Sequence, residues 1–153
     1  MITIYKSQRM LFVTKGKRTV FTCPVHLGFA PDGHKQAEGD GRTPEGKYRI
    51  CSVNPDSKFH FAFGISYPNA RDARKAWREK RLKPADALFV ILANALLLKP
   101  KWTTPLGGCI MLHGESPEKK NGDWTQGCVA LSDADIKALS ALVGKGEKVR
   151  ILP

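Results

Sequence analysis

One stretch of this chain contains both residue types that thiol catalysis needs, a histidine and a cysteine. His113 follows the apolar run 109–112, and Cys128 follows Gly127 in a segment expected to form a tight turn. A thiolate is a strong nucleophile, and a neighbouring imidazole can take the proton from the thiol. A glycine beside the cysteine lets successive backbone N–H groups point at one position, where they can hold an oxyanion. The sequence therefore predicts a nucleophile and a base, and leaves open whether they meet in space.

Two other interpretations of these residues stay open at this point. Both side chains could occupy core or turn positions that carry no chemistry. Alternatively, Cys109, His113 and Cys128 could bind zinc, but their spacing lacks a fourth ligand and matches no standard zinc motif. Cys23, Cys51 and Cys109 each lie in an apolar run, where a free cysteine is expected to be a small core residue. We predict no metal and no other cofactor.

The size and composition of the chain indicate one globular domain that spans residues 1–153. Hydrophobic residues make up 42% of the chain and charged residues 25%, which is typical of a globular protein. The apolar run 87–98 is too short to cross a bilayer, so we expect a buried helix there and no membrane insertion. The first residues alternate like a strand, and no standard signal peptide is visible. The sequence predicts no particular oligomeric state.

The chain is strongly basic, with 25 Lys and Arg residues, 14 Asp and Glu residues and a formal charge of +11. Such a surface favours polyanionic partners, and nucleic acid, anionic lipid and acidic cell-wall polymers all qualify. No nucleic-acid-binding motif is present, so we do not expect nucleic acid to be the main partner. Basic residues are frequent in the predicted helix 70–82, where they form either a solvated face or a platform for an anionic polymer.

The spacing of apolar residues predicts a mostly antiparallel β or α+β domain with roughly seven strands. The first three strands are expected to form a meander with a hairpin turn at residues 15–17. A long loop rich in Gly, Pro and Asp follows at residues 28–46, and loops of this length are more often functional than idle. The predicted strands are 2–6, 9–14, 18–23, 47–53, 59–66, 108–112 and 148–152.

Three helices are expected around these strands. Asn69 is a typical N-cap for the helix 70–82, and Pro84 is a typical first residue for the helix 84–98. Ser132 can cap the third helix, and Gly144 is a typical residue for its end.

The region around the histidine and the cysteine resembles the signature of the L,D-transpeptidase catalytic domain, the YkuD-type family. That signature is His-Gly, a spacer, Ser or Thr, any residue, Gly-Cys and an apolar residue; here it reads His113-Gly114 and Thr125-Gln126-Gly127-Cys128-Val129. Segments 39–48 (Gly-Asp-Gly-Arg-Thr-Pro-Glu-Gly-Lys-Tyr) and 64–69 (Gly-Ile-Ser-Tyr-Pro-Asn) resemble two further landmarks, the second typical of the murein-processing branch. The resemblance extends over residues 2–152.

This resemblance implies an L,D-transpeptidase-like β-sandwich or barrel with peripheral helices, and a reaction on peptidoglycan stem peptides. The cysteine attacks the amide on the carboxyl side of the third-position diamino acid, D-alanine leaves, and the thioester acyl-enzyme passes to an amine or to water. By position, Cys128 is the nucleophile and His113 the general base and then acid. The resemblance also implies that the N–H groups of Gly127 and Cys128 hold the oxyanion. Thr125 matches the Ser/Thr position of the signature, and Gly114 lies where the main chain of family members orients the histidine.

Two positions depart from the usual family pattern. Many members have His before the Gly-Cys pair and Asn or Arg two residues after the cysteine, where this chain has Gln126 and Ala130. The missing Asn or Arg side chain bears on how the substrate carboxylate is held, and so on whether an amine or water accepts the acyl group. Arg42 or Lys35 in the long loop could make that contact instead. The residues predicted to contact substrate are Arg42, Asp123, Trp124 and Gln126.

The predicted function is an L,D-transpeptidase-type cysteine acyltransferase that cross-links peptidoglycan and that carbapenems target. The same site would act as an L,D-carboxypeptidase or amidase-type hydrolase if water outcompetes the amine. A catalytically silent wall-binding module that uses its positive charge is the alternative from another class. The family implies a location in the cell envelope or periplasm, or secretion.

Overall fold

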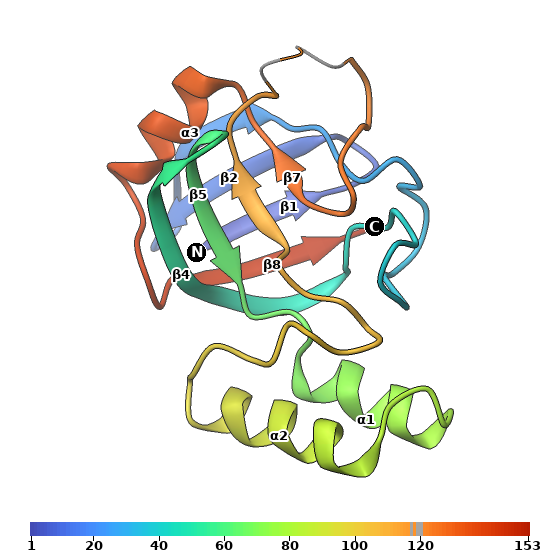
Figure 1. Ribbon diagram of the computed structural model, residues 1–153. Helices are drawn as coiled ribbons and strands as arrows, with labels where there is room; N and C mark the ends of the chain where they lie inside the picture. The colour runs from blue at the N-terminus through green and yellow to red at the C-terminus, as the bar shows by residue number, and fades with distance from the viewer. Residues whose placement is uncertain (117, 119–120) are drawn as a thin grey trace.

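Eight β-strands form one strongly curved sheet in the computed structural model, which describes residues 1–116, 118 and 121–153. Within these residues the strand order is β3-β2-β1-β8-β4-β5-β6-β7 (Figure 1). Neighbouring strands are antiparallel except for the parallel pairs β1–β8 and β6–β7. The predicted β-rich fold is confirmed, and β7 is a strand that the sequence pattern does not predict. The strands are β1 (Ile2–Tyr5), β2 (Met10–Lys15), β3 (Arg18–Pro24), β4 (Gly46–Ser57), β5 (His60–Ile65), β6 (Met111–His113), β7 (Val129–Ala130) and β8 (Lys148–Leu152).

The middle of the sheet joins the two ends of the chain. Ile2 and Ile4 of β1 and Val149 and Ile151 of β8 are almost fully buried, and the two strands pair in parallel. These residues alternate with polar or exposed ones, which is the pattern expected of strands with one face on a core. The main core contains apolar side chains from all eight strands and from helix α3 (Asp133–Ser140).

The helices lie outside the sheet and begin where the sequence predicts. Asn69 and Ser132 cap α1 (Ala70–Arg78) and α3 through side-chain hydrogen bonds, and Pro84 is the first residue of α2 (Pro84–Ala95). The end of α3 differs from the prediction, because its C-cap is Ala141 rather than Gly144. The carbonyl of Gly144 instead accepts a hydrogen bond in the turn that leads into β8.

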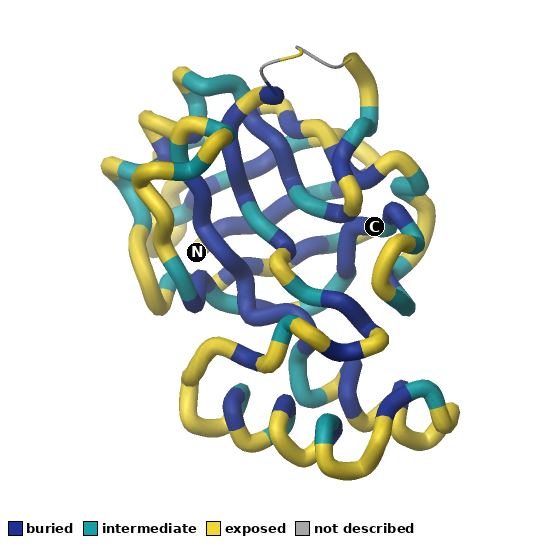
Figure 2. The backbone as a smooth tube through the Cα atoms, viewed as in Figure 1, coloured by how far each residue is buried: buried dark blue, intermediate teal, exposed yellow. Residues whose placement is uncertain are grey.

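Helices α1 and α2 pack against each other beside one end of the sheet (Figure 1). The helix expected over 84–98 is present, but the prediction that it is buried is wrong. The helix ends at Ala95, and Leu88, Phe89 and Leu92 are each more than half exposed (Figure 2). Their apolar character predicts burial, but only the opposite side of α2 contacts α1. Within the described residues, no helix is long and apolar enough to cross a membrane. The residues that form the small core of the helix pair are Ala73, Ala76, Leu82, Ala87, Val90 and Leu106.

The prediction that three of the cysteines are core residues is confirmed for two of them. Cys23 and Cys51 are buried, with 2% and 5% of each residue exposed. Cys109 is exposed, and its φ of +54° shows that the backbone turns there. The core prediction for Cys109 is therefore wrong, because the expected strand begins only at Met111.

Candidate active site

Strand β6 places His113 in a buried position between two aromatic rings. Leu112 points into the core, so His113 lies on the other face of the strand, and only 3% of it is exposed. The imidazole stacks on the ring of Phe59 with centroids 4.5 Å apart, and it meets the Trp124 ring edge-on at 5.7 Å. These two contacts restrict the rotation of the imidazole.

A main-chain contact fixes which imidazole nitrogen carries the proton. Nδ1 of His113 lies 2.7 Å from the carbonyl oxygen of Gly114. Because a carbonyl can only accept, Nδ1 donates and Nε2 keeps a free lone pair. Burial lowers the pKa of His113, the Gly114 carbonyl acts against that effect, and Lys58 adds to it. The imidazole is therefore neutral at neutral pH, with Nε2 available as a base.

Cys128 lies directly before β7, the parallel neighbour of β6. The register of this pair sets His113 opposite Ala130, two residues after Cys128. Residues two apart on an extended strand point to the same face. The β6–β7 pairing therefore brings the imidazole on β6 and the thiol directly before β7 to one face of the sheet.

The Cys128 thiol has two hydrogen-bond partners among the described residues, one at the start of β6 and one just before it. The N–H of Met111 donates to Sγ at 3.4 Å, and the thiol donates to the carbonyl of Cys109 at 3.5 Å. Although part of the residue reaches solvent, burial raises the pKa of Cys128 to about 11; the Met111 N–H and Lys35 lower it, and Cys109 raises it. At neutral pH the thiol therefore keeps its proton, next to a neutral imidazole.

Thr125 holds the turn that presents the thiol. Its hydroxyl accepts from the N–H of Gly127 at 3.1 Å and donates to the carbonyl of Cys128 at 2.7 Å. Gly127 has a φ of +119°, and a Cβ at this position would lie 2.5 Å from the carbonyl oxygen of Arg42, so the turn requires glycine. The Gly127 N–H is occupied by Thr125. The N–H of Cys128 has no hydrogen-bond partner among the described residues.

The long loop between β3 and β4 forms a wall beside this turn. The N–H of Phe29 donates to the carbonyl of Thr125 at 2.9 Å. Deeper in the loop, buried Lys35 forms an ion pair with Asp40 at 2.8 Å. Burial would raise the pKa of Asp40, but the Lys35 hydrogen bond and three backbone N–H groups lower it to about 2. The Asp40 carboxylate is thus ionised at neutral pH, and Lys35 contributes to lowering the pKa of the Cys128 thiol.

Three of the residues predicted to contact substrate lie around the thiol and the imidazole. Trp124 contacts the imidazole directly. Gln126 is exposed in the turn before the cysteine. Arg42 brings its carbonyl against Gly127, while its side chain is half-buried.

The fourth of these residues, Asp123, is already engaged by the scaffold. One carboxylate oxygen accepts from the N–H of Leu27 at 2.8 Å, and the other pairs with Arg9 at 2.9 Å. The carboxylate therefore ties the segment before Trp124 to the residue that precedes β2 and to the segment that follows β3.

Phe59 and the Cys109 carbonyl are contacts of the site that sequence reasoning does not identify. The sequence indicates Phe59 only as an apolar strand residue. Its place beside His113 depends on the β5–β6 pairing, in which Ala62 lies opposite His113. No local signal encodes that register. Among the described residues, no group of three or more His, Cys, Asp or Glu side chains could hold a metal ion.

Known proteins resemble this chain in both sequence and fold. The model of the YkuD family, the L,D-transpeptidase catalytic domain, matches residues 1–151. YafK of Escherichia coli (strain K12) is 32% identical over an alignment of 90 residues that covers 53% of this chain and 35% of that protein. The chain thus spans about a third of the length of this curated relative.

Two solved structures share the fold over nearly the whole chain. A point mutant of the helical cell shape determining protein Pgp2 from Campylobacter jejuni gives a TM-score of 0.66 at 25% identity, with 99% of this chain and 45% of that chain covered. Bd1075 of Bdellovibrio bacteriovorus gives a TM-score of 0.63 at 24% identity, with 99% and 47% covered. The chain spans about half the length of either structure.

Proposed function

Since this chain belongs to the L,D-transpeptidase catalytic-domain (YkuD) family, we propose that it is a cysteine acyltransferase acting on peptidoglycan stem peptides in the cell envelope. The observation that carries the proposal is the pairing of β6 with β7. It brings the Cys128 thiol and the His113 imidazole to one face, with Nδ1 of the imidazole committed to Gly114 and Nε2 free.

The first half of the reaction forms a thioester. Nε2 of His113 takes the thiol proton while Sγ of Cys128 bonds to the carbonyl carbon of the amide that follows the diamino acid. The N–H of Cys128 stabilises the oxyanion of the tetrahedral intermediate. When the intermediate collapses, the C–N bond breaks and the imidazolium gives its proton to the leaving amine of D-alanine.

The second half returns the enzyme to its starting state. An amine of another stem peptide attacks the thioester carbonyl, and Nε2 of His113 accepts a proton from this amine. The C–S bond then breaks, the imidazolium protonates the departing thiolate, and a new amide is released. If water attacks instead, the product is a shortened stem peptide with a free carboxylate.

The protonation states of the two groups support this order of events. Burial raises the pKa of Cys128 and lowers that of His113, so a neutral pair is favoured over a thiolate–imidazolium pair. Proton transfer is therefore coupled to attack on the substrate, as in general-base catalysis.

The test is the incubation of the chain with a defined tetrapeptide muropeptide and an amine acceptor, followed by mass spectrometry of the products. A cross-linked dimer indicates transpeptidation, and a tripeptide indicates hydrolysis. Cys128→Ala should slow either reaction by at least about a thousandfold. Cys109→Ser removes a neighbouring exposed thiol and should leave the rate within about twofold.

If Cys109→Ser abolished turnover and Cys128→Ala left it unchanged, the nucleophile would be Cys109. If the wild-type chain binds sacculi but releases no product, the domain is a silent wall-binding module. As a second readout, a carbapenem should add its mass to the wild-type chain and not to Cys128→Ser.

A further inference from the structure

Four basic side chains form a cluster on the face of β4 and β8 that points away from the core. The antiparallel register places Lys47 opposite Arg150 and Arg49 opposite Lys148. The residues that alternate with them, such as Tyr48 and Val149, are buried in the core. Directly opposed side chains lie about 5 Å apart at Cβ, where like charges destabilise a sheet. The arrangement costs stability and brings no compensating contact within the sheet.

Most of these cations have no acidic partner. Among the described residues, no ion pair involves Lys47, Lys148 or Arg150. Arg49 donates to a main-chain carbonyl, that of Leu98, at 2.7 Å. The cluster is therefore left with uncompensated positive charge.

The nearby carboxylates are engaged elsewhere. Glu45 pairs with Lys6 at 2.7 Å, and Glu147 pairs with the N-terminal amine at 2.8 Å. Asp72 accepts from the backbone N–H of Asn69 at 2.8 Å and faces Nε2 of His34 at 3.3 Å. Neutralisation of the cluster thus requires an anion from outside these contacts.

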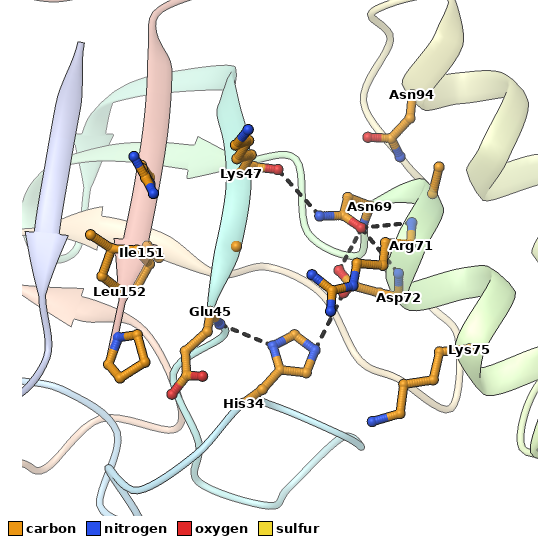
Figure 3. A pocket seen from close by; sticks show the side chains of 14 residues that line it. His34, Glu45, Lys47, Asn69, Arg71, Asp72, Lys75, Asn94, Ile151 and Leu152 are labelled. Atoms are coloured by element: carbon orange, nitrogen blue, oxygen red, sulfur yellow. Dashed lines mark hydrogen bonds and ion pairs between the residues drawn. The ribbon is translucent and has the colours of Figure 1, made fainter.

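A groove runs past the cluster, between the sheet and the helix pair. One cavity of about 690 Å³ is lined by Lys47 and Arg150 from the sheet and by Arg71 and Lys75 from α1. Figure 3 shows Lys47 on the strand side of this cavity and Lys75 on the helix side. A second cavity, of about 740 Å³, shares Lys47 and Arg150 and adds three further cations, Arg49, Lys145 and Lys148. We call the two together the cationic groove; its basic lining residues are Lys47, Arg49, Arg71, Lys75, Lys145, Lys148 and Arg150.

The cationic groove is separate from the thiol site. Neither Cys128 nor His113 lines either cavity. The long loop runs between the two regions. His34 of this loop lines the groove, held by Asp72 and by the N–H of Glu45, which donates to Nδ1 at 3.0 Å. Farther along the loop, the Arg42 carbonyl packs against the catalytic turn.

We infer that the cationic groove binds an acidic polymer, a peptidoglycan strand with free stem-peptide carboxylates, at a distance from the bond being exchanged. The choice of polymer rests on the proposed function. Several cations on two walls of a groove match a chain of carboxylates better than a single small anion. Nucleic acid fits less well, because neither cavity has an exposed aromatic ring on which a base could stack.

The test compares two double variants that remove the same charge. Lys47→Gln with Arg150→Gln neutralises an opposed pair in the groove, and Lys17→Gln with Arg18→Gln neutralises two exposed residues at the β2–β3 hairpin. Both are made in a Cys128→Ala background so that the polymer stays intact. Binding is measured by co-sedimentation with purified sacculi at low salt. The groove variant should bind roughly tenfold more weakly, and the hairpin variant less than about twofold more weakly.

A second groove variant, Arg71→Gln with Lys75→Gln on the opposite wall, should weaken binding in the same direction. Equal losses in the groove and hairpin variants, or no loss in either groove variant, would overturn the inference. Tighter binding to single-stranded DNA or to anionic vesicles than to sacculi would overturn the choice of polymer. Melting curves confirm that each variant is folded.

Turnover of a soluble tetrapeptide, measured with Cys128 intact, separates this inference from the proposed function. The groove variants should convert it at the wild-type rate, because their substitutions lie outside the thiol site. If no chain converts it but sacculus binding still depends on the groove, the inference stands and the acyltransferase proposal fails. If turnover is normal and the groove variants bind sacculi like the hairpin variant, the inference fails alone.

Discussion

The thiol site and the cationic groove are built on opposite principles. Around Cys128, a glycine-dependent turn, a hydroxyl bridge from Thr125 and the main-chain contact of a buried imidazole hold the atoms of the proposed reaction in place. In the groove, flexible exposed side chains such as Lys47 and Arg150 face one another with the same charge. Making and breaking bonds requires exact positions, whereas attraction of a polymer requires charge over a wide area. The activity of the thiol site should therefore be sensitive to the addition of a single methyl group. Binding in the groove should instead depend on the total positive charge of its lining.

The largest effect on stability and turnover is expected from Gly127→Ala in the thiol site. The added Cβ meets the Arg42 carbonyl at 2.5 Å, and alanine disfavours a φ of +119°. We expect a loss of about 3 kcal/mol in the free energy of unfolding. Displacement of the thiol should also reduce kcat/KM roughly a hundredfold. Chemical denaturation and tetrapeptide turnover measure the two effects.

Gly144→Ala is the matched control, because a Cβ there meets no atom within 4 Å. It should change stability by less than about 0.5 kcal/mol and leave turnover unchanged. If both substitutions were equally harmless, the glycine turn would not be what positions the thiol.

An intermediate effect is expected from pH. Because the pKa of Cys128 is raised to about 11, alkylation of its thiol by iodoacetamide should accelerate about tenfold per pH unit through the neutral and mildly alkaline range. A Cys109→Ser background removes the neighbouring exposed thiol, and intact-mass time courses give the rate. A rate that levels off near neutral pH would instead reveal a preformed thiolate, and the neutral-pair mechanism would have to be abandoned.

The smallest effect is expected from relief of repulsion in the groove. Lys47→Gln with Arg150→Gln removes a directly opposed like-charge pair and should raise stability by about 0.2–1 kcal/mol at low salt. Added salt should stabilise the wild-type chain more than this variant, because it screens exposed charges. Thermal melts with and without added NaCl measure both effects. Lower stability of the variant would mean that the pair is not under repulsion.

Local signals in the sequence predict much of the fold. Asn69, Pro84 and Ser132 start helices because helix capping depends on a few adjacent residues. The exposure of Leu88 and of Cys109 is not predictable in this way, since it depends on which surfaces another element covers.

The candidate site likewise contains features that the local sequence predicts and features that depend on contacts between distant segments. Cys128, His113 and the glycine turn are identifiable from residue types and from the family resemblance. The stacking of Phe59 on His113 is not, because it depends on the β5–β6 register. The engagement of Asp123 by Arg9 likewise joins residues far apart in the chain.

The parallel pairing of β1 with β8 also determines how the domain bears mechanical load. Ile2 lies opposite Val149 and Tyr5 opposite Leu152, so the N- and C-termini leave this central pair at opposite ends (Figure 1). A force that pulls the termini apart slides the two strands along each other and loads the hydrogen bonds of the pair together. An antiparallel hairpin pulled at its open end would instead release them one after another. Tension applied through the chain ends therefore acts in shear on the hydrogen bonds between β1 and β8.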